Sequence, residues 1–155
     1  MNVSLNSTHV SFVLFNKRPY SVISFDKVFY QSNEAVSAVL EFLPPLLQPG
    51  KRLDLALRYL NSTVFTEASG DRPGNKDVAV IITDGFVNKG GEKDVSDAIS
   101  ALKSNNVKLL TISTDRVNIR EEVLYEIAGI NVLLCSSLEE LTASVEKIAS
   151  IACDG

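Results

Sequence analysis

Several residue types and patterns are scarce or missing from this chain of 155 residues, and each absence argues against a class of protein. It has a single histidine, His9, so a Ser-His-Asp catalytic apparatus has no support. Lys and Arg form no block and the formal net charge is −4, which gives no reason to expect a nucleic acid partner. No apolar run approaches the ~18 residues that suggest a membrane span. Neither G-x-G-x-x-G nor G-x-x-x-x-G-K-[ST] occurs, which argues against a phosphate-binding loop.

Cysteine is also scarce, with only Cys135 and Cys153. Cys135 ends an apolar run, and Cys153 follows the expected last helix, residues 137–152, which would be about 24 Å long at ~1.5 Å per residue. A disulfide needs Cα atoms within about 7 Å, so the two are not expected to pair with each other. We expect Cys135 to be a buried, small apolar residue. Cys153 is either a free thiol or the disulfide partner of a residue outside this chain.

The remaining composition fits one globular domain spanning residues 1–155. The apolar fraction is 45% and the charged fraction 22%, as is usual for globular proteins. The first ten residues, MNVSLNSTHV, are polar and do not resemble a signal peptide. Three N-x-S/T sequons, at Asn2, Asn6 and Asn61, favour a secreted origin with a secretion signal further upstream, although such tripeptides also arise by chance.

Hydrophobic patterns predict an alternation of strands and helices. Residues 10–15 and 20–25 are β-rich and predict a hairpin with Pro19 at its turn. Asp94 is an expected N-cap, and capping boxes are expected at 118–121 and 137–140. The pattern predicts helices over 33–43, 53–64, 94–104, 118–128 and 137–152, and strands over 78–83, 107–113 and 131–135.

These last three strands are apolar on both faces, which is typical of a parallel sheet covered by helices on both sides. The predicted class is therefore α/β, a doubly wound and mostly parallel sheet with an antiparallel hairpin strand at one edge.

The most informative point in the chain is the junction at the end of the run VAVII, where Thr83, Asp84 and Gly85 follow. Ligands of open α/β sheets bind at the carboxyl ends of the strands. A carboxylate at that position is a candidate metal ligand or ligand-binding group. The question for the rest of the chain is therefore whether it supplies further ligand groups to accompany Asp84.

Several segments together resemble a known family. They are ALRYL at 56–60, VFT at 64–66, GDRPG at 70–74, VAVIITDG at 78–85, the hairpin segment HVSFVLFNKRPYSVISF, and the C-terminal pieces NVKLLTIS, LYEIAG, NVLLCSSLEEL and SIAC. In this order they resemble a von Willebrand factor type A domain, in particular those of matrix proteins such as collagen VI chains and matrilins. The resemblance covers nearly the whole chain.

The chain departs from that family at its beginning. The family starts with a strand carrying an Asp-x-Ser-x-Ser signature and a long helix, and neither is present here. Because the family's strand order is 3-2-1-4-5-6, the missing strand would be central. Three outcomes are open: the flanking strands pair directly, a partner chain fills the gap, or the chain is a fragment with a compromised fold. We expect residues 10–15 and 78–83 to pair directly.

The resemblance also bears on metal binding. Family members that bind a divalent cation use the three positions of Asp-x-Ser-x-Ser, a Thr before the third helix, and the Asp of Thr-Asp-Gly. Here only Asp84 of these residues is present, and the Thr position aligns with Lys51, which has no acceptor atom. We therefore expect a degenerate adhesion site around Thr83, Asp84 and Lys51, and no bound metal unless a missing N-terminal segment restores the Mg²⁺ ligands. Asp84 would instead accept hydrogen bonds from loop amides or pair with Lys51.

The resemblance implies a non-enzymatic interaction domain of an extracellular adhesion or matrix protein. Its partners would be other matrix proteins, collagen or a cell-surface receptor, bound without metal through loops or helix faces. One alternative is an α/β enzyme or nucleotide-binding protein, for which the strand ends offer only Asp84, Lys51, Ser113 and Asp115. The other is a structural fragment with no independent binding function.

Overall fold

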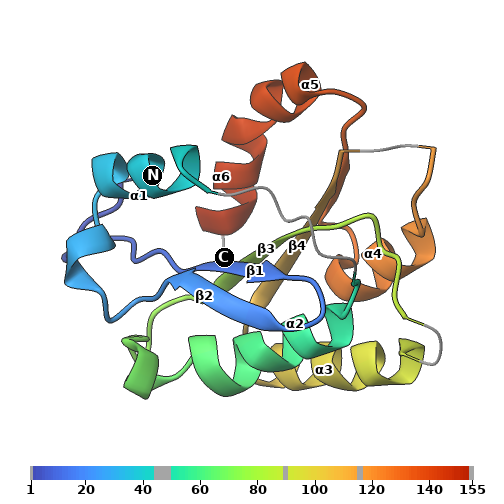
Figure 1. The fold of residues 1–155 in the computed structure, drawn as a ribbon, viewed down its shortest axis with the longest axis horizontal. Coiled ribbons are helices and arrows are strands. Elements are labelled where there is room, and N and C mark those ends of the chain that lie inside the picture. The colour runs from blue at the N-terminus through green and yellow to red at the C-terminus, as the bar shows by residue number, and fades with distance from the viewer. Residues whose placement is uncertain (1, 44–49, 89–90, 115–116, 154–155) are drawn as a thin grey trace. The chain divides into compact units, whose positions relative to one another are not determined.

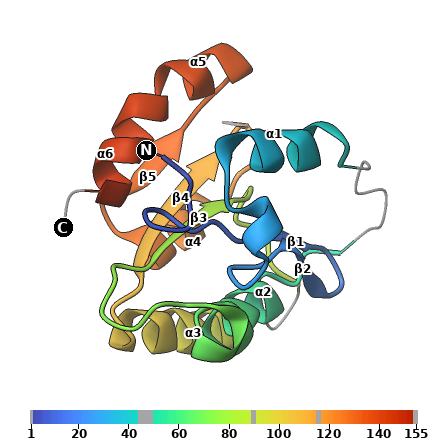
Figure 2. The same cartoon turned by 90° about the vertical axis from the view of Figure 1, so that its left-hand side faces the viewer.

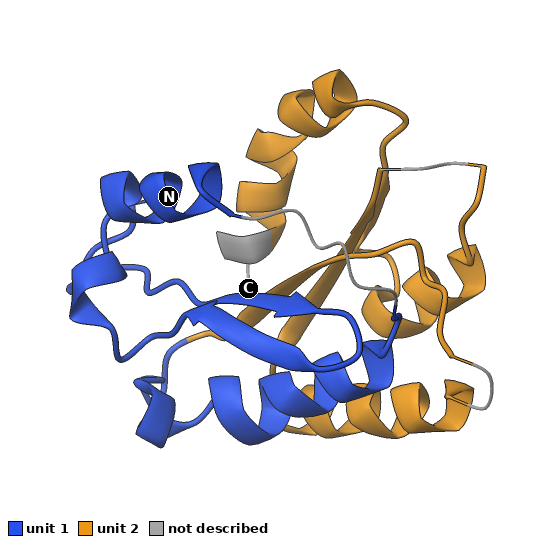
Figure 3. Ribbon diagram, viewed as in Figure 1, with its two compact units in different colours: residues 1–75 blue, residues 76–155 orange. Residues whose placement is uncertain are grey.

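The computed structural model describes residues 2–43, 50–88, 91–114 and 117–153, with side chains to residue 151. The contacts divide the chain into two compact units, Met1–Asn75 and Lys76–Gly155, coloured separately in Figure 3. Each unit has a sheet of its own and is described separately. Among the described residues, every helix is too short or too polar to cross a bilayer.

The first unit contains an antiparallel hairpin made of β1 (Phe12–Phe15) and β2 (Pro19–Ile23). Pro19 was expected at the turn but begins β2, where it lies opposite Phe15. Because proline cannot donate a ladder hydrogen bond, it is restricted to positions such as the first residue of a strand. The turn is formed by residues 16–18, and the side chain of Asn16 accepts a hydrogen bond from the Lys17 amide.

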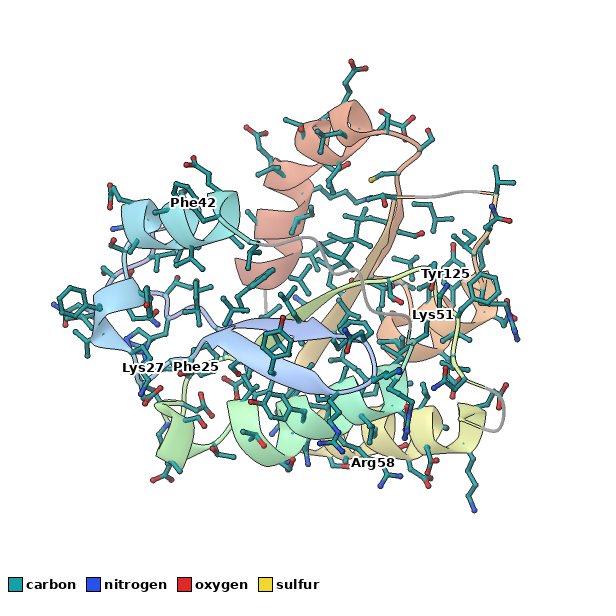
Figure 4. All side chains as sticks on the ribbon, viewed as in Figure 1. Phe25, Lys27, Phe42, Lys51, Arg58 and Tyr125 are labelled. Atoms are coloured by element: carbon teal, nitrogen blue, oxygen red, sulfur yellow. The ribbon has the colours of Figure 1, made fainter. Side chains whose placement is uncertain are left out.

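Short helices complete the first unit. They are the 3₁₀ turn η1 (Val28–Tyr30), α1 (Asn33–Glu41), α2 (Leu53–Tyr59), the π-helical turn η2 (Leu60–Val64) and the 3₁₀ turn η3 (Glu67–Ser69). The Ser32 hydroxyl caps α1 by accepting a hydrogen bond from the Ala35 amide at 3.1 Å. The predicted helix over 53–64 is confirmed as α2 continued by η2. Figure 4 labels Phe42, which follows α1 and is 84% exposed.

An ion pair with a buried carboxylate lies at the start of α2. The side chain of Asp54 is 5% exposed, and Arg52 reaches its two carboxylate oxygens through Nε at 2.8 Å and Nη2 at 2.5 Å. The hydrogen bonds from Arg52 lower the pKa of Asp54 below its usual value, so this carboxylate stays ionised despite its burial. A carboxylate in the first turn also complements the helix dipole.

The second unit is built on three parallel strands in the order β3 (Val78–Ile82), β4 (Lys108–Ser113) and β5 (Val132–Leu134). Its helices are α3 (Glu92–Ser104), α4 (Glu121–Ala128), α5 (Leu138–Ala143) and α6 (Val145–Cys153), as Figure 1 shows.

Helices cover both faces of β4, the central strand of this sheet. On one face, Leu110 and Ile112 of β4 form a core cluster with Leu133 and Cys135, against which side chains of α5 and α6 pack. On the other face, the buried hydroxyl of Thr111 donates a hydrogen bond to the carbonyl of Leu124 in α4 at 3.3 Å. Figure 2 gives a second view of this arrangement. The predicted α/β class with a parallel sheet is confirmed, but the expected cover on both faces is wrong for β3, where Val80 and Ile82 are 44% and 57% exposed.

The described strands form two separate sheets, so the expected direct pairing of residues 10–15 with 78–83 is wrong. The hairpin is a two-stranded sheet of its own rather than an edge of the parallel sheet. One physical reason lies within the hairpin, where the register against β2 shifts between Phe12 and Val13. Irregularities of this kind bend a strand and interrupt further pairing.

Several predicted helix boundaries also differ. Helix α3 begins at Glu92, so Asp94 is a first-turn residue and not the N-cap. The capping box expected at 118–121 is wrong because α4 begins at Glu121, after Arg120. The expected last helix is divided at Ser144, whose hydroxyl donates to the Glu140 carbonyl at 2.8 Å and competes with regular helix hydrogen bonding.

The Ser137 cap of the box expected at 137–140 is confirmed. The Ser137 hydroxyl accepts a hydrogen bond from the Glu140 amide at 3.2 Å, as predicted. The Glu140 carboxylate accepts a hydrogen bond from the amide of Ser136 at 2.8 Å. Cys135 is buried with a free thiol, which confirms its prediction. The side chain of Cys153 lies outside the described residues, and its pairing remains a prediction.

Candidate functional site

The candidate site is the loop that follows β3. The Thr83 amide donates to the Ile112 carbonyl at 3.0 Å, which extends the parallel pairing one residue beyond β3. The chain then leaves the sheet at Asp84, as the end of the apolar run predicts. Thr83 and Asp84 are both half-buried, so the junction is neither an exposed loop tip nor part of the core.

Two side chains of this junction hold the loop in shape. The Asp84 Oδ1 atom accepts a hydrogen bond from the Phe86 amide at 3.0 Å. The Thr83 Oγ1 atom accepts one from the Gly85 amide at 3.1 Å. Both are local turns in which a side chain replaces a backbone acceptor two residues back. Of the two roles predicted for Asp84, accepting a hydrogen bond from a loop amide is observed, and pairing with Lys51 remains a prediction.

The loop is also tied to the start of α4. The Arg120 amide donates to the Asp84 carbonyl at 2.9 Å. Gly85 has φ +78°, and a Cβ at this position would lie 2.6 Å from the Arg120 carbonyl oxygen. Only glycine fits this backbone conformation and this close approach. The hydrogen bond from the Arg120 amide to the Asp84 carbonyl also explains why α4 begins at Glu121, later than the expected capping box predicts.

Arg120 is a residue that sequence reasoning missed at this junction. Its guanidinium pairs with Glu122, and this hydrogen bond lowers the pKa of the Glu122 carboxyl. The only sequence signal that could have indicated the contact is the glycine after Asp84, because a glycine directly after a strand can mark a close backbone approach.

A divalent cation site at this junction would need several metal-ligating groups close together. Within the ranges that the structure describes, no three His, Cys, Asp or Glu side chains come together as a metal would need. At the junction one carboxylate oxygen is already engaged by a loop amide. Mg²⁺ requires an octahedron of oxygen ligands, and one carboxylate does not supply it.

The other predicted site residues lie elsewhere. Lys51 is exposed and lies two residues before α2 in the first unit (Figure 4), whereas Asp84 belongs to the second unit, so their pairing remains a prediction. Ser113 is buried at the end of β4, where its carbonyl accepts the Cys135 amide at 2.8 Å. Asp115, the other residue considered for an enzyme, lies outside the described residues.

The three sequons differ in their surroundings. Asn2 and Asn6 are exposed, and Asn61 is half-buried in η2. The Asn2 side chain accepts a hydrogen bond from the amide of Asn33 at 3.4 Å. An attached glycan needs solvent around the asparagine amide, so Asn2 and Asn6 are the better placed acceptors.

Comparison with known families gives a match over residues 1–150 to the model of the von Willebrand factor type A domain. Von Willebrand factor A domain-containing protein 1 of Mus musculus is 29% identical over 121 residues, which cover 78% of this chain and 28% of that protein. Its Homo sapiens counterpart is 32% identical over 72% of this chain and 23% of its own length. Matrilin-4 of Mus musculus is 25% identical over 77% of this chain. The chain therefore spans less than a third of these relatives.

Solved structures show the same fold. Proximal thread matrix protein 1 from the mussel byssus superposes with a TM-score of 0.86 at 20% identity, covering 97% of this chain and 38% of that one. A second structure of that protein has zinc in its MIDAS motif. The manganese-loaded TRAP protein of Plasmodium vivax has a TM-score of 0.75 at 18% identity over 96% of this chain.

Proposed function

The chain belongs to the von Willebrand factor type A domain family, and we propose that it is a non-enzymatic interaction domain whose binding does not depend on a metal ion. Domains of this family typically mediate adhesion and protein–protein interaction. The proposed partners are matrix proteins, collagen or a cell-surface receptor. The proposed site is a degenerate form of the family's adhesion site, represented by Thr83, Asp84 and Lys51.

The proposal that binding is independent of metal rests on the contacts of the Asp84 carboxylate. Its carboxylate accepts a loop amide within its own turn, and the described residues bring no further pair of acidic, histidine or cysteine side chains to it. A cation-dependent site would need that carboxylate together with several other oxygen ligands. In this chain the side chain shapes a loop, and a partner would meet the loop surface directly.

An extracellular location belongs to the same proposal. Two exposed sequons, at Asn2 and Asn6, would be available to the glycosylation machinery of the secretory pathway. Among the relatives are a matrilin and, by fold, a byssal thread matrix protein. Secretion from mammalian cells followed by enzymatic removal of N-glycans should lower the mass of the chain. An unchanged mass in secreted material would contradict glycosylation, and failure to be secreted behind a heterologous signal would contradict the location.

Binding to immobilised collagen and to intact cells tests the interaction. The chain is titrated in the presence of Mg²⁺ and again in EDTA, with Asp84→Asn as a matched variant that keeps the Oδ1 acceptor. We expect saturable binding with the same Kd in both buffers and in both proteins. Loss of binding in EDTA would overturn the metal-independent mechanism. Absence of saturable binding to either surface would overturn the interaction domain itself.

A further inference from the structure

The first unit contains a polar pocket that the proposed function does not use. It has a volume of about 200 Å³ and lies among the end of β2, helix α2 and the turns η2 and η3. All of its lining residues belong to the first unit. Six of them carry hydroxyl groups: Ser11, Ser21, Ser24, Tyr59, Thr63 and Ser69. The pocket is therefore lined mainly by groups that both donate and accept hydrogen bonds.

Backbone contacts fix the walls of this pocket. The Asp26 amide donates to the Ser69 carbonyl at 2.9 Å, which ties the segment after β2 to η3. At Gly70, with φ +87°, a Cβ would lie 2.4 Å from the Asp26 amide nitrogen, so the two segments approach as closely as a glycine allows. The rings of Phe25 and Phe65 also contact each other, with centroids 6.0 Å apart. A ligand would meet a preformed site and lose little free energy in ordering it.

The hydroxyls retain unused hydrogen-bonding capacity. Ser21 Oγ and Tyr59 Oη lie 3.2 Å apart and share one hydrogen bond, which leaves one of their two hydrogens available. Ser24 donates to the Asp26 Oδ1 atom at 2.6 Å and keeps its own lone pairs. The Ser69 hydroxyl has no hydrogen bond to any described residue. The pocket thus presents both donors and acceptors at fixed positions.

Charge and shape restrict the ligand further. Asp26 is the one charged residue of the lining, and Lys27 Nζ neutralises it at 2.8 Å, a contact that also lowers the pKa of Asp26. Figure 4 shows Phe25 and Lys27 close together after β2. An anion would find no cation in the lining, whereas a neutral hydroxyl could donate to the carboxylate. The rings of Phe25 and Tyr59 add apolar surface suited to C–H groups.

From these features we propose that the pocket binds one neutral, polyhydroxylated ring of monosaccharide size, either as a free sugar or as the terminal residue of a glycan. Its volume is below the roughly 300–1,000 Å³ of pockets that enclose drug-sized ligands, so a single sugar ring is the appropriate size. The inference stands on the geometry of the first unit and does not rest on the proposed interaction with matrix proteins.

The test is a titration of the isotope-labelled chain followed by amide chemical shifts. The probes are glucose, galactose, mannose and N-acetylglucosamine, each as free sugar and as methyl glycoside. We expect saturable shifts for at least one sugar, concentrated at the amides of residues 24–26 and 69–70, with a Kd on the order of millimolar for so small a ligand. Equal affinity for the glycoside supports a glycan terminus as the source, and weaker affinity supports the free sugar. No saturable shift with any probe would overturn the proposal.

Three variants locate the binding. Tyr59→Phe keeps the ring and removes one hydroxyl, so it should raise Kd about five- to tenfold, as expected for one neutral hydrogen bond. Ser69→Leu should fill the pocket and abolish the shifts. Ser37→Ala changes an exposed hydroxyl of α1 outside the pocket and should bind like the wild type. The amide spectrum of each variant reports its fold. Unchanged affinity in a folded Tyr59→Phe and a folded Ser69→Leu would overturn the assignment.

Discussion

Replacing Asp84 separates a structural carboxylate from a metal ligand. In Asp84→Ala the Phe86 amide loses its acceptor at 3.0 Å, while in Asp84→Asn the Oδ1 acceptor remains. A hydrogen bond of a half-buried group contributes about 1 kcal/mol to the free energy of unfolding. For a chain of this length that corresponds to a decrease in Tm of about 2–4 °C. We expect this decrease for the alanine variant and a Tm within about 1 °C of wild type for the asparagine variant, on the same scale.

The decisive comparison adds a divalent cation. A ligand that binds only the folded chain at 100 times its Kd would stabilise it by about 2.7 kcal/mol. The Tm would then rise by about 5–10 °C. Because the described residues supply no cluster of metal-binding side chains at Asp84, we expect the same Tm in Mg²⁺, in Mn²⁺ and in EDTA for all three proteins.

Differential scanning calorimetry measures all of these values in one series. A metal-dependent rise of the wild-type Tm that disappears in Asp84→Ala would refute the reasoning, because it would show that Asp84 and ligands outside the described residues bind the ion. An alanine variant as stable as wild type would show instead that the loop hydrogen bond contributes nothing.

Three further predictions concern the fold. Gly85→Ala should lower the free energy of unfolding by at least about 1–2 kcal/mol in urea titrations, because φ is +78° and the new Cβ would meet a backbone oxygen; an unchanged midpoint would contradict this. Arg52 lowers the pKa of Asp54, so the ionised Asp54 stabilises the folded chain. This stabilisation is complete above pH ~4 and is lost as the pH falls through the folded-state pKa of Asp54. In Asp54→Asn the free energy of unfolding should therefore fall less steeply at acidic pH than in the wild type. Equal slopes for the two proteins would contradict this prediction. Leu110→Ala should cost about 2–5 kcal/mol, whereas the matched change at Leu138, which is 76% exposed, should stay within about 0.5 kcal/mol.

Much of the second unit could be predicted because its signals are local. The run at β4 is buried on both faces, as a helix-covered parallel strand requires, whereas Val80 and Ile82 of β3 are 44% and 57% exposed. Asp84 was placed correctly after β3 because the apolar run that forms the strand stops there. Its role as an acceptor for a loop amide also followed, since aspartate commonly hydrogen-bonds to the backbone two residues on.

The errors arise where distant segments compete for the same groups. A capping box was expected at 118–121, but the Arg120 amide pairs with the Asp84 carbonyl and the helix begins only at Glu121. The pairing of residues 10–15 with 78–83 was expected from a gap in the family's strand order, yet the described strands form two sheets. A local sequence pattern does not indicate which distant group a backbone amide will hydrogen-bond or which strand an edge strand will pair with.

The amino-acid order was enough to establish the α/β class, the family and the place of Asp84, because hydrophobic periodicity and the polar residues that interrupt it are properties of short segments. The close approach of Gly85 to Arg120, the burial of Asp54 beside Arg52, and the hydroxyl pocket formed by residues between 11 and 69 emerged only from the folded chain. These features depend on distances between atoms of different elements, and packing, hydrogen bonding and chain entropy together set those distances.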